Sequence, residues 1–332
     1  MRSIAVRVLI ADKFDRSGIE ALEAAGCEVI VDPGLGPDTL SDALATHRPD
    51  MLIVRSTKVP AAIIEGQDSL KGIIRAGAGH DNIDSSAASS KGVAVCNCPG
   101  MNAVAVAELA MGHIINCDRR LPAQDAELRR GHWFKKEYAK ARGLKGQTLL
   151  LVGMGAIGRE VATRANAFGI DTVGWSRSLT PERAESMGVR YGGSTHDDLM
   201  TQLGQADIVS LHVAATPETK GMCDGAFFGS MKDGATFVNT ARGTLVDEDA
   251  LLEAVDAKGL RVGTDVYQNQ PGTPDEPFET PLAKSDSVFC SHHCGASTDQ
   301  AQSAVAEETV RIVTEFQKTG RFVNVVNELQ PA

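Results

Sequence analysis

Residues 148–168 read TLLLVGMGAIGREVATRANAF, and this stretch decides the fold. The short apolar run predicts a buried strand, the glycines of GMGAIG predict a tight turn, and the residues that follow have helical spacing. At such a junction Gly153 permits the turn, Gly155 lets the backbone approach a pyrophosphate, and Gly158 allows the helix to pack closely on the strand. The amino end of the helix then faces the anion. This order of elements favours dinucleotide binding over a purely structural glycine turn.

The end of the next predicted strand bears on the choice of dinucleotide. An Asp or Glu about 20 residues after the glycines normally accepts hydrogen bonds from the ribose hydroxyls of NAD. This sequence has Ser176 and Arg177 there. The pair removes a carboxylate that would repel a 2′-phosphate and adds a guanidinium that could hold one. NAD and NADP are therefore both candidate cofactors, since an Arg177 that is solvated or stacked on adenine leaves NAD acceptable.

On both sides of this stretch, short β-branched runs alternate with longer Ala-rich segments, which is typical of βαβ units and parallel sheets. The segment from Ala103 is expected to run as one long helix to Gly131. The amphipathic segment 299–322 predicts a last helix that packs back on the first domain. The fold class is therefore α/β with two doubly wound parallel-sheet domains that meet near residue 100. The runs that predict strands are 6–12, 27–32, 51–56, 72–77 and 93–98 in the first domain, and 148–152, 171–176, 206–213, 235–241 and 260–266 in the second.

Composition excludes several classes of protein. A length of 332 residues favours two domains over one core. The net charge of −10, with no dense Lys/Arg cluster, disfavours nucleic acid as a partner. No apolar run reaches the length of a membrane span, and the N-terminus predicts a strand instead of a signal peptide. The seven cysteines are scattered, which suits reduced thiols in the cytoplasm.

Three loops of the second domain carry residues that suit catalysis. Arg242, Asp265 with Gln270, and His293 each follow a predicted strand. Because ligands bind beyond the carboxyl ends of parallel strands, these loops are expected to converge at one site. The neighbouring Cys290, His292 and Cys294 could suggest zinc, but all lie in one short loop and no distant pair completes a tetrahedron, so no metal is predicted.

With these motifs in this order, the chain resembles the D-2-hydroxyacid dehydrogenase family, and within it the D-3-phosphoglycerate dehydrogenases, over almost its whole length. The resemblance implies a Rossmann cofactor domain, residues 101–296, inserted into a flavodoxin-like substrate domain, residues 1–100 plus 297–332. It also implies a homodimer built through the cofactor domains, and hydride transfer between NAD(P) and a small D-2-hydroxy or 2-oxo acid. The matching stretches are VRSTKV (54–59), RAGAGHDNID (75–84), N and VAE in 102–108, LVGMGAIGREVA (151–162), NTARG (239–243), DEDALLEAV (247–255), DV (265–266) with QP (270–271), and HCGAST (293–298).

The resemblance implies a role for each matched residue. Arg242 would grip the substrate carboxylate and polarise the 2-oxo group, because a planar fork suits a carboxylate. His293 would be the general acid for reduction and the base for oxidation. Asp265 would hold the nicotinamide carboxamide. The other residues expected to contact the cofactor are Gly153, Gly155, Ala156, Ile157, Gly158, Ser176, Arg177, His212, Val213, Thr240, Ala241, Gly295 and Ala296.

Several residues are expected to bind the substrate. The backbone at Ala78 and Gly79 would bind the carboxylate from the first domain. Arg55 and Lys58 match positions that hold a charged substrate tail, such as the phosphate of 3-phosphoglycerate or 3-phosphohydroxypyruvate. Arg75 matches another basic position of that group and is expected to contact the substrate. Lys135 is expected to reach a partner subunit's site. The alternative for each of these cations is ordinary solvated surface charge.

One position departs from the family pattern. Where the family has a Glu that pairs with the catalytic His, this chain has Gln270 before Pro271, although a shifted alignment would recruit Glu276. A Glu would raise the pKa of His293, whereas Gln only orients the ring through a neutral hydrogen bond. The NAD-dependent formate dehydrogenases of this superfamily also pair Gln with His, so formate oxidation is an alternative.

A non-catalytic NAD(H)-sensing scaffold is another alternative, because the C-terminal-binding-protein corepressors share these motifs. Intact Arg242 and His293 favour an enzyme over such a scaffold. The chain ends soon after the last predicted helix, so the C-terminal regulatory domain of many phosphoglycerate dehydrogenases is not expected.

Overall fold

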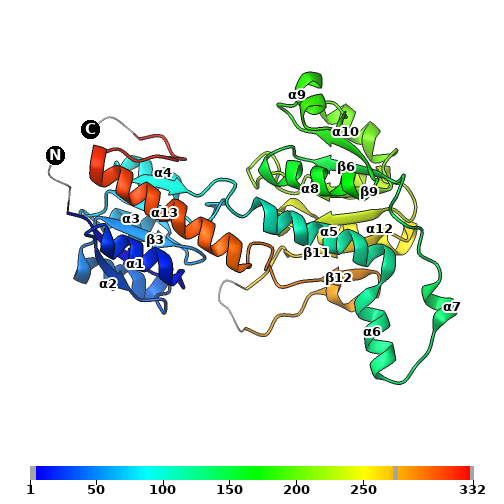
Figure 1. Cartoon of the computed structure of the whole chain (residues 1–332), viewed down its shortest axis with the longest axis horizontal. Helices are drawn as coiled ribbons and strands as arrows, with labels where there is room; N and C mark the ends of the chain where they lie inside the picture. The colour runs from blue at the N-terminus through cyan, green and yellow to red at the C-terminus, as the bar shows by residue number, and fades with distance from the viewer. Residues whose placement is uncertain (1–4, 272–275, 330–332) are drawn as a thin grey trace. The chain divides into compact units, whose positions relative to one another are not determined.

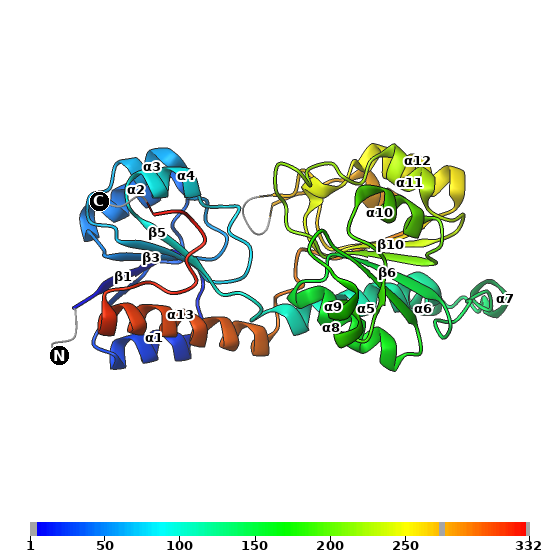
Figure 2. The same ribbon diagram turned by 90° about the horizontal axis from the view of Figure 1, so that it is seen from above.

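The computed structural model describes residues 5–271 and 276–329, which fall into two compact units (Figures 1 and 2). One unit holds the described residues up to Asn102 and from Ser297 onward, and the other holds those between Ala103 and Ala296. The second unit thus interrupts the first in sequence. Each unit is a parallel sheet with helices on its faces, so the predicted fold class is confirmed.

The first unit contains a five-stranded parallel sheet in the order β2-β1-β3-β4-β5, which is the flavodoxin-like order. Its strands are β1 (Arg7–Ile10), β2 (Glu28–Val31), β3 (Met51–Val54), β4 (Gly72–Arg75) and β5 (Ala94–Asn97). Its helices are α1 (Arg16–Ala24), α2 (Pro37–His47), α3 (Ala61–Glu65), α4 (Ser85–Ser90) and α13 (Asp299–Thr319).

Apolar clusters cover both faces of this sheet, which is why the strands read as continuous hydrophobic runs. All four residues of β3 are buried. Leu40 and Leu44 of α2 pack on one face together with α3 and α4. Ile312 and Phe316 of α13 pack on the other face beside Leu22 of α1. The prediction that the last helix packs on the first domain is therefore confirmed.

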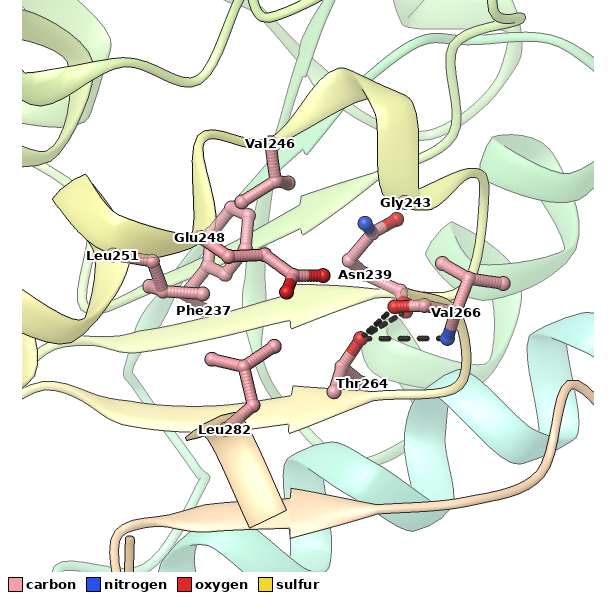
Figure 3. A pocket seen from close by; sticks show the side chains of 9 residues that line it. All are labelled: Phe237, Asn239, Gly243, Val246, Glu248, Leu251, Thr264, Val266 and Leu282. Atoms are coloured by element: carbon pink, nitrogen blue, oxygen red, sulfur yellow. Dashed lines mark hydrogen bonds between the residues drawn. The ribbon is translucent and has the colours of Figure 1, made fainter. Parts of the chain in front are cut away.

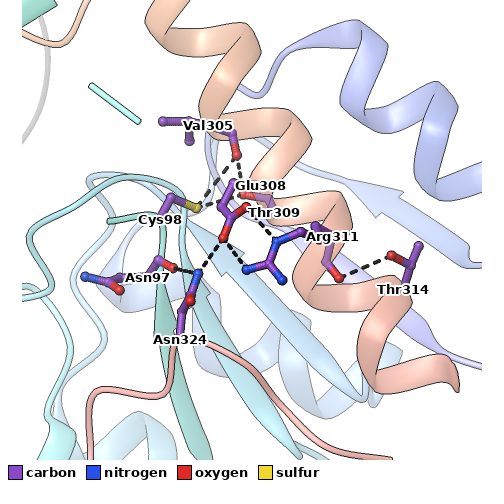
Figure 4. Close-up of polar contacts among 8 residues, drawn as sticks. All are labelled: Asn97, Cys98, Val305, Glu308, Thr309, Arg311, Thr314 and Asn324. Carbon is purple, nitrogen blue, oxygen red and sulfur yellow. Dashed lines mark hydrogen bonds and ion pairs between the residues drawn. The ribbon is translucent and has the colours of Figure 1, made fainter. Parts of the chain in front are cut away.

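Polar contacts fasten the segment after α13 to the edge of this sheet (Figure 4). The Asn324 amide donates to the carbonyl oxygen of Asn97 at 3.2 Å and to the Glu308 carboxylate at 2.5 Å. Arg311 pairs with the same carboxylate at 2.6 Å, and this hydrogen bond is the main reason that the pKa of Glu308 is lowered. These contacts join the end of the chain to β5.

The second unit contains a seven-stranded parallel sheet in the order β12-β11-β10-β9-β6-β7-β8. The chain order reverses between β9 and β6, which is the switch point where doubly wound sheets bind ligands. Its strands are β6 (Thr148–Val152), β7 (Asp171–Trp175), β8 (Arg190–Tyr191), β9 (Ile208–Leu211), β10 (Thr236–Asn239), β11 (Arg261–Thr264) and β12 (Val288–Cys290). Its helices are α5 (Ala103–Arg119), α6 (Leu121–Arg129), α7 (Lys135–Tyr138), α8 (Ala156–Ala167), α9 (Pro181–Ser186), α10 (His196–Leu203), α11 (Gly225–Ser230) and α12 (Glu248–Lys258), with 3-10 turns η1 (Gly243–Leu245) and η2 (Pro281–Lys284).

The predicted long helix after Ala103 is wrong in one respect. Helix α5 ends at Arg119, and Arg120 takes a left-handed conformation with φ 53° before α6 begins. Pro122 explains the break, because it lacks an N–H and its ring would clash with the carbonyl of Asp118 in a continuous helix. None of the described helices is both long and apolar enough to cross a bilayer.

Candidate active site

The glycine turn lies between β6 and α8. Gly153 has φ +108°, and a Cβ there would lie 2.6 Å from the carbonyl carbon of His212, so only glycine fits. At Gly158 a Cβ would overlap the carbonyl oxygen of Gly153. The Cβ position of Gly155 faces open space, and no described side chain caps α8 there. The amino end of α8 is therefore accessible to an anion.

Unsatisfied polar atoms lie beside this turn, at the ends of β9 and β10. Both ring nitrogens of His212 and the hydroxyl of Thr240 are buried, and none has a hydrogen-bond partner in the described part of the chain. Burial lowers the pKa of His212 to about 3, so its ring is neutral at physiological pH. Buried polar atoms rarely lack partners. Together with the open face of Gly155, these atoms fit the polar groups of a bound dinucleotide.

The loop after β7 is open to solvent. The carbonyl of Ser176 accepts a hydrogen bond from Leu179 N at 2.9 Å, and this turn leaves Arg177 exposed. The pKa of Glu218 is lowered chiefly by a hydrogen bond from Thr216, with a smaller contribution from the charge of Arg177. The Arg177 guanidinium therefore lies near the carboxylate of Glu218, and a buried hydrogen-bond network does not fix its position.

Asp265, just after β11, organises the loop that carries His293. Its side chain is 2 % exposed. Oδ1 accepts from Cys294 N at 3.0 Å, and Oδ2 accepts from Gly295 N at 2.8 Å. Its carbonyl oxygen accepts from His293 N at 2.8 Å. His293 has φ +50°, a conformation that few residues other than glycine adopt, and these three bonds hold the backbone there.

Gln270 contacts His293 directly. Its Nε2 lies 2.6 Å from His293 Nδ1, and its Oε1 accepts from Tyr267 N at 3.3 Å. Because the oxygen must face the backbone N–H, the amide NH2 group faces the imidazole and donates to Nδ1. A neutral His293 then carries its proton on Nε2, the nitrogen on the other side of the ring. Gln270 is thus a hydrogen-bond partner of this histidine.

The loop with Arg242 packs against the loop with Gln270. A Cβ at Gly243 would overlap the backbone carbonyl of Tyr267, so these two loops touch through their main chains. The Arg242 guanidinium is half-buried and donates to the carbonyl of Ala241 at 2.8 Å. Two of the predicted catalytic loops are thus adjacent.

A small cavity lies beneath these loops (Figure 3). Glu248 points into it beside Thr264, and its carboxylate accepts from Gln268 N at 2.6 Å. Burial raises the pKa of Glu248. The cavity measures about 10 Å³, roughly the space of one water. It is too small for a substrate, and Glu248 serves to attach the loop of Gln270 to α12.

In the first unit, the predicted substrate residues lie after β3 and β4. The Asp12 carboxylate accepts from the backbone N–H groups of Arg55 at 2.6 Å and Thr57 at 3.1 Å, which fixes the loop that carries the exposed Lys58. The Arg55 guanidinium reaches Gln302 and Ser297 at 3.4 and 3.3 Å. The Arg75 guanidinium lies against Gly77, where a Cβ would overlap it.

Ala78 and Gly79 follow in the same loop and are partly exposed. The Ala78 carbonyl accepts from the Asn97 amide at 2.6 Å, which anchors the loop to the end of β5. Lys135 belongs to the second unit and is exposed at the start of α7.

Residues 111–295, more than half of the chain, match the protein family described as D-isomer specific 2-hydroxyacid dehydrogenase, NAD binding domain. The chain belongs to this family. Its glycine turn and the buried, unpartnered atoms of His212 and Thr240 agree with the NAD-binding assignment of that domain.

The chain is similar to known enzymes over most of its length. It is 42% identical over 264 residues to a hydroxypyruvate reductase of Thermotoga maritima, a match that covers 79% of this chain and 82% of that protein. It is 38% identical over 327 residues to a D-3-phosphoglycerate dehydrogenase of Methanocaldococcus jannaschii. That match covers 97% of this chain but spans 60% of the length of the relative. A crystal structure of a glyoxylate reductase from Paecilomyes thermophila, 28% identical, covers 98% of this chain and is itself covered to 99%, with a TM-score of 0.86.

The structure brings part of the predicted site together within this family's NAD-binding domain. Gln270, Asp265, His293 and Gly295 are joined by hydrogen bonds. Ala156 and Ile157 begin α8, Val213 lies against Gly153, and Ala241 is buried beside Thr240. Ala296 ends the loop of His293. No group of three or more His, Cys, Asp or Glu side chains that could hold a metal ion occurs among the described residues.

Sequence reasoning missed four supporting residues. Asp12 fixes the loop of Arg55, and Glu248 fixes the loop of Gln270. His113 and Ser291 lie behind Asp265, where Ser291 Oγ is 2.6 Å from its carboxylate. The one available signal was His113 itself, a polar residue on the buried side of an apolar helix.

Proposed function

We propose that this chain is an NAD(P)-dependent oxidoreductase that moves a hydride between the nicotinamide ring and a small D-2-hydroxy or 2-oxo acid. One observation carries the proposal: His293 is hydrogen-bonded to Gln270 and clamped by Asp265, at the same sheet edge as the glycine turn. The dinucleotide, when bound, accepts or supplies the hydride. The residues of the chain bind the acid, orient it and manage the proton on the substrate oxygen.

Each proposed role follows from the chemistry of the side chain. Arg242 would bind the substrate carboxylate through its planar fork and polarise the 2-oxo group. Asp265 Oδ2 accepts from Gly295 N and has a further lone pair for a carboxamide N–H. His293, with Nε2–H directed away from Gln270, would donate to the 2-oxo oxygen and so stabilise the charge that develops during reduction.

Full proton transfer from His293 makes a further demand on Gln270. An imidazolium carries a proton on both nitrogens, so Nδ1 would then need an acceptor. Gln270 supplies one only if its amide rotates and gives up the bond to Tyr267 N. Gln270 therefore favours a donor that polarises the carbonyl over a strong general acid. The same argument supports a second candidate, formate oxidation, which has no alcohol proton to transfer.

For the substrate, we propose a 2-oxo acid with an anionic tail, with 3-phosphohydroxypyruvate as the first to test. Arg55, Lys58 and Arg75 would bind the phosphate, and the backbone at Ala78 and Gly79 would bind the carboxylate. Lys135 would add a cation from a partner subunit. The name of the M. jannaschii relative supports this choice. For the cofactor, the exposed Arg177 beside Ser176 supports NADP as well as NAD.

We also propose a homodimer in the cytoplasm. Leu121, Leu128, Trp133 and Phe134 of the segment α6–α7 are 49–77 % exposed, which is unusual for four large apolar side chains within 14 residues of sequence. All seven cysteines are free, which suits a reducing compartment. Light scattering should give twice the chain mass of 35.1 kDa, and a monomer at micromolar concentration would contradict the dimer.

The activity is tested by the loss of NADH or NADPH absorbance with 3-phosphohydroxypyruvate, hydroxypyruvate and glyoxylate, with formate plus NAD or NADP in the opposite direction. Turnover of a 2-oxo acid supports the dehydrogenase, and the better dinucleotide identifies the cofactor. Turnover of formate alone would support the second candidate. Tight NADH binding without any turnover would support a nicotinamide-sensing scaffold instead.

A further inference from the structure

A buried chain of polar groups runs from α5 to the loop of His293. His113 Nε2 lies 3.0 Å from Ser291 Oγ, and Ser291 Oγ lies 2.6 Å from Asp265 Oδ1. His113 and Asp265 are 6 % and 2 % exposed. A carboxylate only accepts, so the single hydroxyl proton of Ser291 points to Asp265. His113 must then carry a proton on Nε2 and donate it to Ser291.

This series of hydrogen bonds ends on Asp265, which holds the loop of His293. The Asp265 carboxylate that receives the serine bond also accepts from Cys294 N and Gly295 N. The backbone of Asp265 accepts from His293 N. A shift of the carboxylate would therefore move Cys294 and Gly295. These two residues directly follow His293, which carries the imidazole in a left-handed conformation.

Glycine at position 263 of β11 leaves room for the side chain of His113. A Cβ at Gly263 of β11 would lie 2.6 Å from the Cβ of His113 and 3.0 Å from its Nδ1. A side chain at residue 263 would push the imidazole away from Ser291. Burial lowers the pKa of His113, opposed by the nearby charge of Asp265, so the ring is neutral and its single proton suffices for the bond to Ser291.

We propose that His113 is a positioning residue for hydride transfer: acting through Ser291, it fixes the Asp265 carboxylate and with it the orientation of His293. This inference rests on the proposed dehydrogenase function. His113 does not touch the reacting atoms, so its loss should lower kcat much more than it raises the KM of the 2-oxo acid.

The first experiment compares His113→Leu, which removes the donor, with His113→Gln, whose amide can still donate to Ser291. Ile114→Val, the adjacent buried residue outside the network, is the matched control. A displacement of the imidazole by about 1 Å costs about 100-fold in rate, so His113→Leu should lose about 10-fold to 100-fold in kcat with KM within about threefold. His113→Gln should recover most of the rate, and Ile114→Val should retain it.

Ser291→Ala breaks the same series of hydrogen bonds without changing the packing of α5. Its loss in kcat should match that of His113→Leu, and the double variant should be no slower than either single variant. Additive losses, an unchanged kcat in His113→Leu, or an equal loss in Ile114→Val would overturn the proposal.

A readout without turnover separates this inference from the proposed function. In protein with ¹⁵N-labelled imidazoles, His293, assigned with a His293→Asn variant, should give one sharp signal protonated at Nε2. His113→Leu and Ser291→Ala should broaden or split that signal, whereas Ile114→Val should not. If no 2-oxo acid is reduced, the proposed function fails, and an unperturbed His293 signal in His113→Leu would still refute the positioning role.

Discussion

Two loop regions at the carboxyl edge of the seven-stranded sheet are built differently. After β7, Ser176 and Arg177 are partly or fully exposed, and only a local turn orders them. After β11 and β12, Asp265 is buried and joined to Ser291, Cys294 and Gly295. Under the proposed function, cofactor choice would depend on exposed side chains that can change without disturbing the fold. The region proposed to handle the substrate proton would depend on a hydrogen-bond network in which each member positions the next.

The largest expected effect is at His293. His293→Ala removes the proposed donor to the substrate oxygen, and general acid–base groups contribute about 10²-fold to 10⁴-fold. We expect kcat to fall by this factor in the oxidation of NADH by the 2-oxo acid, while the dissociation constant of NADH changes little. His292→Ala, the exposed neighbour, is the control and should keep its rate.

The next effect is at Asp265. Asp265→Asn places an NH2 group against one of the hydrogen-bond donors that now face the carboxylate, and an unsatisfied buried polar group costs about 1–3 kcal/mol. Both kcat and the midpoint of thermal unfolding should fall, the latter by about 2–4 °C for each kcal/mol. Asp286→Asn, on an exposed side chain, should change neither. A fully stable, fully active Asp265→Asn protein would show that the two regions do not differ as described.

Gln270→Glu should alter the pH dependence of reduction. A carboxylate beside His293 Nδ1 stabilises the imidazolium and raises the pKa of the histidine. The limb of the rate profile that reports the protonated histidine should therefore move to higher pH. Gln268→Glu, exposed in the same loop, is the control. An unchanged profile would contradict the proposal that residue 270 tunes the protonation of His293.

A smaller effect is expected at Arg177, in the exposed loop after β7. Arg177→Ser removes the guanidinium proposed to face a 2′-phosphate, and a surface charge contact of this kind is worth about 1 kcal/mol. The KM for NADPH should rise about fivefold to tenfold, with little change for NADH and none in thermal stability. Arg190→Ser, at the exposed edge strand, is the control. An equal rise for both dinucleotides would assign Arg177 to adenine stacking instead.

The smallest effect concerns Glu248 under the catalytic loops. Burial raises its pKa in the folded protein, so its contribution to stability is present below the unfolded pKa and is lost as pH rises through the folded pKa. Glu248→Gln has no carboxyl group to ionise, so the variant does not lose this stability as pH rises. Its amide oxygen can still accept the hydrogen bond from Gln268 N. The variant should therefore be at least as stable as the parent protein near pH 7, and its advantage should shrink as pH falls toward 4.5. Thermal unfolding across this range, with the exposed Glu253→Gln as control, measures it.

Local signals in the sequence account for most of the fold. The glycine turn was predictable because φ +108° at Gly153 and the close packing at Gly158 tolerate no side chain. The strands were predictable because parallel strands are buried on both faces and read as apolar runs. Strand β8 was not predicted, since two exposed residues carry no such pattern. The break in the helix after Arg119 had a signal, Pro122, that periodicity alone does not weigh.

The site was predictable only in part. Spacing placed Gln270 as the partner of His293, but the direction of the bond follows from Tyr267 N, which no motif reveals. The bond from His113 to Ser291 joins residues 178 positions apart and depends on how α5 packs on β11. Long-range polar networks of this kind require tertiary packing, which the sequence pattern does not specify.

The most direct test of the central claim uses NADH with deuterium at both positions of C4 of the nicotinamide, and hydroxypyruvate or 3-phosphohydroxypyruvate as acceptor. Direct hydride transfer predicts one deuterium at C2 of the D-hydroxy acid product, at a rate that collapses in His293→Ala but not in His292→Ala. A product without deuterium, or no product from any 2-oxo acid while NADH binds, would contradict the account.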